Sequence, residues 1–168
     1  MNPQDLTKEQ ALQLLEDFAK RWLAHDGLWF LEVEKNFGMD NAIKLDEAAW
    51  AQFTVIEAKR IKDFLKLPEN GGLEALKEAL KFRLYGFLNQ QEIIFAGNKL
   101  IYKMTTCRVQ EARKRKKLPD FPCKPVGITE YTGFAKAIDP RIKTRCIACP
   151  PDEHPEEFYC AWEFWVED

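Results

Sequence analysis

The amino-acid sequence predicts an α+β protein in which N-terminal helices pack on a C-terminal α+β half with a small antiparallel sheet and a cysteine metal site. Residues 1–90 carry apolar side chains at helical spacing over long stretches. Residues 91–168 carry short alternating stretches and turn residues, which are typical of strands. Four of the five cysteines lie between Cys123 and Cys160. We expect a single domain, 1–168, built from these two parts.

Length and composition restrict the class of protein. A chain of 168 residues can bury a core of its own, and 46% hydrophobic residues indicate a globular protein. A net charge of -2 gives no overall attraction to nucleic acid or to an anionic membrane. No apolar stretch approaches the roughly 18 residues of a membrane span, and we expect no leader peptide because no apolar run precedes Thr7. We therefore expect a cytoplasmic protein that binds neither nucleic acid nor membrane, with a homodimer as a possible assembly.

The cysteine spacing is the most specific pattern in the chain. Cys146 and Cys149 form a C-x-x-C pair, and Cys123 and Cys160 can complete a tetrahedral shell around one ion. The prediction is a structural zinc site. The alternatives are ordinary buried or redox thiols, an iron–sulfur cluster, and a site in which His154 replaces one sulfur.

A capping box at residues 7–10 opens the first predicted helix. If this helix continues past Gly27, its inward stripe includes a carboxylate, Asp26, beside His25. The members of that stripe are Leu15, Phe18, Ala19, Trp22, Asp26, Trp29, Val33 and Phe37. In the alternative interpretation, Asp26 caps a break at Gly27 and His25 is exposed, because glycine inside a helix costs about 1 kcal/mol.

A second helix is predicted from near Asp46 to Leu67, and a third from Leu73 to about Leu88. The inward stripe of the second helix runs from Trp50 to Phe64 and is interrupted by Glu57. Two interrupted stripes on neighbouring helices predict an internal polar site between them. The alternative places Glu57 at the edge of the surface.

The C-terminal part begins with a β-hairpin over 92–96 and 99–104, whose turn is Gly97-Asn98. Further elements are predicted as helices over 105–118 and 125–138 and strands over 141–147 and 158–166. Cys107 lies in the first turn of a helix next to Arg108, where the helix dipole favours a thiolate. Alternatively, Cys107 is a small half-buried residue that joins a strand to a helix. The basic run 113–117 is expected to be the solvated end of that helix.

Cys123, Cys146, Cys149 and Cys160, with the segment from Cys123 to Ile138, resemble the zinc-holding C-terminal half of the 4-vinyl reductase domain. That resemblance implies an α+β domain that binds small molecules, although an acidic residue often stands in its sensors where this chain has Cys146. The segment 22–34 is similar to small bacterial and archaeal proteins related to L-2-amino-thiazoline-4-carboxylic acid hydrolase.

Two functions follow as hypotheses, and a purely structural interaction module is a third. The first is a small-molecule-binding domain with a structural zinc ion, whose polar groups include His25 and Asp26 and whose ligand contacts come from Trp29, Glu57, Tyr102 and Arg108. The second is a hydrolase of the thiazoline-carboxylate type. Its nucleophile would be Cys107, or its base would be His25 with Asp26, and Arg108 would hold the substrate carboxylate.

Overall fold

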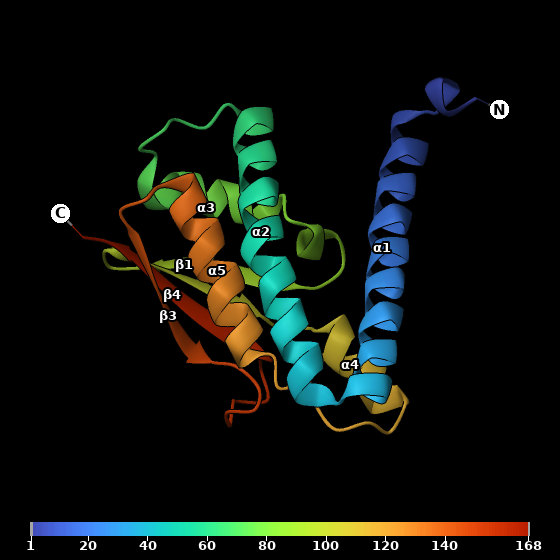
Figure 1. Ribbon diagram of the computed structural model, residues 1–168. Helices are drawn as coiled ribbons and strands as arrows, with labels where there is room; N and C mark the ends of the chain where they lie inside the picture. Colours follow the sequence, from blue (N-terminus) through green and yellow to red (C-terminus); the bar gives the residue numbers. More distant parts are fainter. Residues whose placement is uncertain (1, 168) are drawn as a thin grey trace.

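The protein was analysed as a computed structural model that describes residues 2–167 (Figure 1). The helices are the short 3-10 helix η1 (Pro3–Asp5), α1 (Lys8–Phe37), α2 (Met39–Leu65), α3 (Gly72–Lys81), the 3-10 helix η2 (Leu84–Phe87), α4 (Arg108–Arg115) and α5 (Lys124–Ile138). The strands are β1 (Gln91–Ala96), β2 (Lys99–Met104), β3 (Ile142–Ala148) and β4 (Cys160–Val166). The chain is therefore α+β, as the sequence predicts.

The strands form one antiparallel sheet in the order β1-β2-β4-β3. Tyr102 lies opposite Trp162, and Trp162 lies opposite Cys146, so these three side chains share one face of the sheet. Met104 lies opposite Cys160, two residues further along the same face. This register places two cysteines at one end of the sheet, on the face that turns toward the helices.

The helices form successive layers over that face of the sheet. α5 packs against β3, and α3 contacts β2 and β4. α2 packs along α5, and α1 packs on α2, so that α1 is the outermost helix (Figure 1). The main core lies between the sheet, α3 and α5, with Leu80, Tyr102, Phe134 and Trp162 among its fully buried side chains. Within residues 2–167, none of the helices is apolar over a length that could cross a membrane.

α1 is continuous through Gly27, which decides between the two interpretations of its sequence. Thr7 forms the predicted capping box with Gln10. The second helix begins at Met39, not near Asp46, because Gly38 makes the whole connection. Gly38 has a φ of 82°, in the left-handed region that favours glycine, and α2 follows it directly.

The third helix is shorter than predicted, since α3 ends at Lys81 and a separate 3-10 turn follows. Between them Arg83 has an extended backbone, and its side chain is completely buried. The guanidinium contacts Glu57 of α2 and Glu130 of α5. A side chain on a regular helix through residue 83 was not expected to make these two contacts. A tertiary ion pair thus replaces the helical continuation that the leucine spacing predicts.

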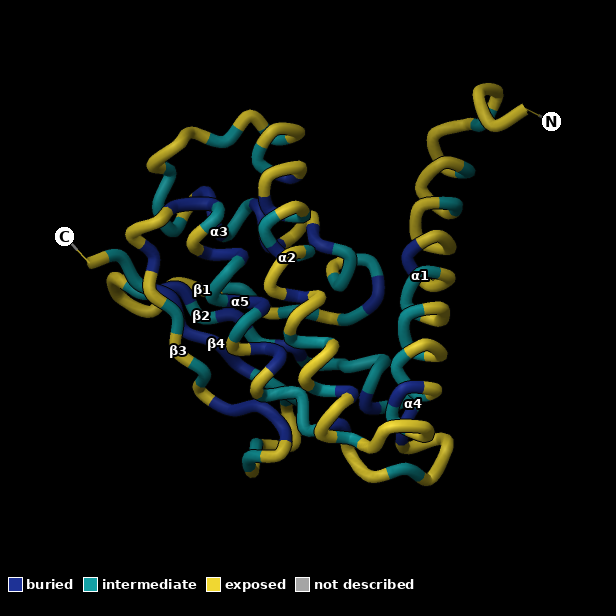
Figure 2. Tube along the Cα trace, in the orientation of Figure 1, coloured by how far each residue is buried: buried dark blue, intermediate teal, exposed yellow. Residues whose placement is uncertain are grey.

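Several side chains of the predicted inward stripes are exposed (Figure 2). On α1 these are Leu15, Phe18, Trp29 and Phe37, and on α2 it is Phe64, which is 75% exposed. The predicted stripe is therefore wrong at these positions. The face of α1 that turns inward contains Leu23, Gly27 and Phe30 in place of Trp29, so it is rotated from the predicted stripe.

The basic run 113–117 is not entirely solvated. Arg113 is buried, and its guanidinium donates to both carboxylate oxygens of Glu34 on α1, at 2.6 and 3.0 Å. It also donates to the carbonyl oxygen of Pro119, at 2.7 Å. The other four cations of the run are exposed, as predicted. Arg113 therefore ties the short helix α4 to α1.

Candidate binding pocket and thiol cluster

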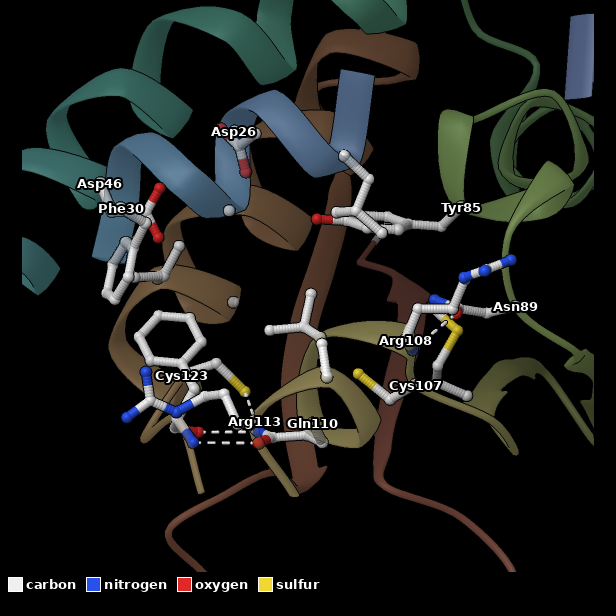
Figure 3. A pocket seen from close by; sticks show the side chains of 18 of the residues that line it. Asp26, Phe30, Asp46, Tyr85, Asn89, Cys107, Arg108, Gln110, Arg113 and Cys123 are labelled. Atoms are coloured by element: carbon white, nitrogen blue, oxygen red, sulfur yellow. Dashed lines mark hydrogen bonds between the residues drawn. The ribbon is translucent and has the colours of Figure 1, made fainter. Parts of the chain in front are cut away.

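A pocket of about 460 Å³ lies where α1, α2, η2, α4 and α5 meet the end of the sheet (Figure 3). Its exposed wall residues include Lys20 and Leu28 of α1 and Arg115 of α4. The mouth therefore opens between α1 and α4. The volume lies within the range of about 300 to 1,000 Å³ that is usual for small-molecule sites in proteins.

Most of the pocket wall is apolar, and much of it is aromatic. The pocket lies where α1 does not pack completely against the rest of the chain. Side chains from α1, α2, α4, α5 and the sheet therefore all reach its wall. The apolar wall residues include Leu23, Phe30, Trp50, Phe121, Val126 and Trp162. Phe30 and Phe121 make an edge-to-face contact, with ring centroids 4.7 Å apart, which joins α1 to the loop before α5.

Three carboxylates line the pocket, each from a different helix: Asp26 of α1, Asp46 of α2 and Glu130 of α5. Burial raises the pKa of Asp26, and burial raises the pKa of Asp46 to about 7 with further increases from Asp26 and Glu130. Burial also raises the pKa of Glu130 to about 7, against the lowering effect of Arg83. The helices thus bring three mutually repelling acids to one side of the cavity.

Arg83 lies behind this wall and is completely buried. Its Nη2 atom is 2.9 Å from Glu57 Oε2 and 2.6 Å from Glu130 Oε1. Its guanidinium also lies over the rings of four aromatic residues: Trp50, Tyr85, Tyr131 and Phe134. Although burial disfavours the charge, Glu57 and Glu130 hold the pKa of Arg83 well above its usual value. Two carboxylates and four rings thus hold this cation, while its Nη1 atom has no hydrogen-bond partner in the described part of the chain.

Glu57, a predicted ligand contact, belongs to this internal ion pair and is not part of the pocket wall. Its carboxylate also accepts the backbone N–H of Leu84, at 3.3 Å. The interrupted stripe of α2 did indicate an internal polar group. Its partner is an arginine from the chain itself, because the extended backbone at Arg83 turns that side chain inward.

The opposite side of the pocket carries the predicted ligand contact Arg108, at the start of α4. The backbone N–H of Arg108 donates to Asn89 Oδ1, at 3.0 Å, which fixes the start of the helix against the loop after η2. In Figure 3 the acids Asp26 and Asp46 lie at one side and Arg108 at the other. The pocket therefore has charges of opposite sign on facing walls.

Cysteine side chains form the base of the pocket. Cys123, Cys149 and Cys160 all line it, and Cys123 Sγ lies 3.5 Å from Cys149 Sγ. Cys149 also makes thiol contacts with Cys146 and Cys160, and together these three neighbours raise the pKa of the Cys149 thiol. A hydrogen bond from Cys149 lowers the pKa of Cys146. Of the four thiols that the sequence singles out, the other three thus surround Cys149.

The local fold explains this gathering. Cys123 precedes α5, and the N–H of Lys124 donates to the carbonyl of Pro150, at 2.9 Å, which holds the start of α5 against the segment after Cys149. A register shift between Cys146 and Ala148 interrupts the pairing of β3 and β4 just before Cys149. Gln110 donates to Phe121 O at 2.8 Å and to Cys123 Sγ at 3.7 Å, which fixes Cys123 from the side of α4.

The donor set of this thiol cluster has the chemistry of a zinc site. Two sulfurs bound to one tetrahedral zinc lie about 3.8 Å apart, and the separation of Cys123 and Cys149 is close to this. Within residues 2–167, however, no group of three or more His, Cys, Asp or Glu side chains is already arranged to hold an ion. The ring of His154 contacts the carbonyl of Pro155, at 2.8 Å, and the ring of Tyr159.

Cys107 also lines the pocket but lacks the activated thiol that its position predicts. Burial raises the pKa of Cys107 to about 12, and hydrogen bonds from the backbone of Gln110 and Val109 oppose this rise only in part. α4 contains only 8 residues, so the favourable dipole at its start is outweighed by desolvation. The alternative interpretation, a half-buried residue that joins β2 to α4, fits the structure.

The structure does not bring the remaining predicted site residues into the pocket. His25 is exposed beside Asp26, and Trp29 is 56% exposed on the outer face of α1. Tyr102 is fully buried behind the wall, with its ring 5.5 Å from that of Tyr131. Of the predicted polar contacts, only Asp26, Cys107 and Arg108 therefore meet at the cavity.

A family of unknown function, DUF6125, matches residues 4–166. The chain belongs to DUF6125. Comparisons with curated proteins and with solved structures gave no significant match. The pocket and the thiol cluster of this DUF6125 chain must therefore be interpreted from their own geometry.

Sequence reasoning missed three polar residues of this DUF6125 chain: Asp46, Glu130 and Gln110. Asp46 was interpreted as the start of a helix. Acidic residues are common at helix starts, so this position did not indicate a site. Glu130 lies next to the predicted inward residue Tyr131, and the inward face of α5 is wide enough to include both. Gln110 contacts residues 11 and 13 positions away, and no local pattern indicates such contacts.

Proposed function

We propose that the chain is a small-molecule-binding domain whose pocket is built over a structural zinc site. The observation that carries the proposal is the pocket of about 460 Å³ with the thiols of Cys123, Cys149 and Cys160 in its wall. Binding sites for small molecules are mostly apolar with a few converging polar groups, which describes this wall. The resemblance of the cysteine pattern to the 4-vinyl reductase domain agrees with this function.

Zinc would be held by Cys123, Cys146, Cys149 and Cys160. With four sulfur ligands the ion has no open position, so it would brace the junction of α5, β3 and β4 and would not activate water. Because three of these cysteines also form the base of the pocket, the ion would fix the shape of the ligand site. Hydrolysis at Cys107 is not favoured, because burial raises the pKa of that thiol to about 12.

A neutral fluorescent probe tests whether the pocket binds ligands. N-phenylnaphthylamine is apolar, fits the volume and becomes brighter when it leaves water. We expect saturable binding to the wild-type protein at one site per chain. Ala24→Trp places a large side chain on the wall near the mouth at an exposed position of α1, where it does not disturb the core. This variant should lose most of the probe binding.

The matched control is Ala48→Trp, an exposed position of α2 that is not on the wall. It should bind the probe like the wild type. Equal binding by the wild type and both variants would place the probe elsewhere and contradict the proposed site. Absence of saturable binding to the wild type would contradict the proposed function.

A further inference from the structure

The inner wall of the pocket, formed by α1, α2 and α5, carries three carboxylates, whereas the basic wall residues lie at the exposed mouth and on the segment of α4: Lys20, Arg108, Arg113, Arg115 and Lys116. Glu57 and Glu130 share one cation, Arg83. Within residues 2–167, neither Asp26 nor Asp46 forms a salt bridge; Asp46 has a hydrogen bond from Trp50, and Asp26 has only the field of the exposed His25. Desolvated carboxylates without a cation are unfavourable, and this accounts for the raised pKa values of both.

A second observation also indicates an absent ligand. Trp162 lines the pocket and is 1% exposed, and its indole N–H has no hydrogen-bond partner in the described part of the chain. Buried polar groups are normally satisfied, so an unpaired donor on a cavity wall needs an explanation. A bound molecule with an acceptor atom would supply the missing partner.

The native cation of the region shows what this environment accepts. Arg83 is held by two carboxylates and by rings that include Trp50 and Tyr85, and both of these rings belong to residues of the pocket wall. Its guanidinium lies behind the wall and pairs with Glu57 and Glu130. Asp26 and Asp46 are therefore the wall carboxylates that Arg83 does not pair with. A second cation beside Asp26 and Asp46 would meet the same combination of aromatic rings and acids.

We propose that the ligand of this pocket is an organic cation, a protonated amine or amidine on an apolar, ring-sized body that also carries one hydrogen-bond acceptor for the Trp162 indole. Its charged group would lie between Asp26, Asp46 and Glu130, and its body would lie against Phe30, Trp50 and Trp162. This inference rests on the proposed function, because it assigns a chemical class to the ligand of the same pocket. Arg108 on the facing wall disfavours a second positive group at the other end of the molecule.

Three indole probes of similar shape separate charge from size: tryptamine is a cation at neutral pH, ethylindole is neutral and indolepropionate is an anion. Isothermal titration calorimetry should show tryptamine binding about tenfold or more tightly than indolepropionate, with ethylindole between them. Asp46→Asn should weaken tryptamine about tenfold and leave ethylindole unchanged. Asp26→Asn should act in the same direction, and it serves as a second variant if Asp46→Asn fails to fold.

The matched control is Asp63→Asn, which removes an exposed carboxylate from the same helix as Asp46 and lies outside the pocket. It should bind all three probes like the wild type. If ethylindole or indolepropionate binds as tightly as tryptamine, the assignment of a cation is wrong although the pocket binds ligands. If none of the three probes binds, the proposed function fails together with this inference.

Discussion

Arg83 Nη2 lies 2.6 Å from Glu130 Oε1 and links the end of the helical part of the chain to α5. The same nitrogen lies 2.9 Å from Glu57, so one buried guanidinium holds together α2, α5 and the segment after α3. The pocket wall formed by Glu130, Tyr85 and Trp50 lies directly on this cluster. The order of the pocket therefore depends on an ion-pair cluster in which only Glu130 belongs to the pocket wall.

Removal of the buried cation should strongly destabilise the fold. Arg83→Ala leaves Glu57 and Glu130 facing each other without a counter-charge, and breaking a buried pair in this way typically costs about 3 to 5 kcal/mol. Urea unfolding followed by circular dichroism measures the free energy of unfolding. The control is Arg21→Ala, which removes an exposed pair with Asp17 on α1 and should cost at most about 1 kcal/mol. Equal losses in the two variants would show that the Arg83 cluster does not organise the core.

Asp46 should make the protein less stable as pH rises. Its pKa is about 7 in the folded protein and near 4 in the unfolded chain, so the folded state binds more protons between these pH values. Stability therefore falls with increasing pH in this window, from about pH 4 to about pH 7. Asp46→Asn should raise the free energy of unfolding above that of the wild type, and this increase should be largest above pH 7 and smallest near pH 4. A difference that is constant with pH would contradict the burial of this carboxylate.

The bond between Arg113 and Glu34 should hold α4, one side of the pocket mouth, against α1. Arg113→Met keeps the apolar stem but removes the donors to Glu34 and Pro119, so we expect a loss of about 2 kcal/mol or more in the free energy of unfolding. Probe binding should weaken as well, because the mouth loses its fixed edge. Lys114→Met, at an exposed neighbouring position outside the pocket wall, provides the control and should change neither quantity appreciably.

Zinc analysis tests the thiol cluster. Purified protein should contain about one zinc ion per chain, and chelation should lower the free energy of unfolding by roughly 4 kcal/mol if zinc was present at a thousandfold excess over its Kd. Cys149→Ser should abolish zinc binding, because Cys149 is the residue that the other three thiols contact. Cys107→Ser should retain the ion. A brown, iron-containing protein would indicate an iron–sulfur cluster in place of zinc. A protein that keeps its full stability without any metal would contradict both kinds of metal site.

The elements with local signals were predictable from the sequence. The capping box at Thr7, the hairpin around Gly97 and the inward face of α5 all follow from short patterns, and the structure contains them. The helix end near Lys81 was not predictable, because the leucine spacing continues to residue 88. The competing contact, Arg83 with Glu57 and Glu130, joins residues far apart in the chain.

The site shows the same division. Asp26 was identified because a carboxylate interrupts an otherwise apolar stripe, and it lies on the pocket wall. Trp29 was assigned to the same face, but the helix turns its ring to solvent. Asp46 and Glu130 complete the acidic wall only after α2 and α5 pack together. Their common location is a property of the tertiary fold, and no pattern within either helix indicates it.

The most direct test of the central claim, that the cavity beside the thiol cluster is a ligand site, is anomalous diffraction from crystals soaked with bromonaphthalene. Bromine is located independently of any assumption about where the ligand binds. The account predicts a bromine peak between Phe30, Trp50 and Trp162, close to the sulfurs of Cys123 and Cys149. A cavity closed by ordered side chains, with bromine found only on the outer surface of the protein, would contradict it.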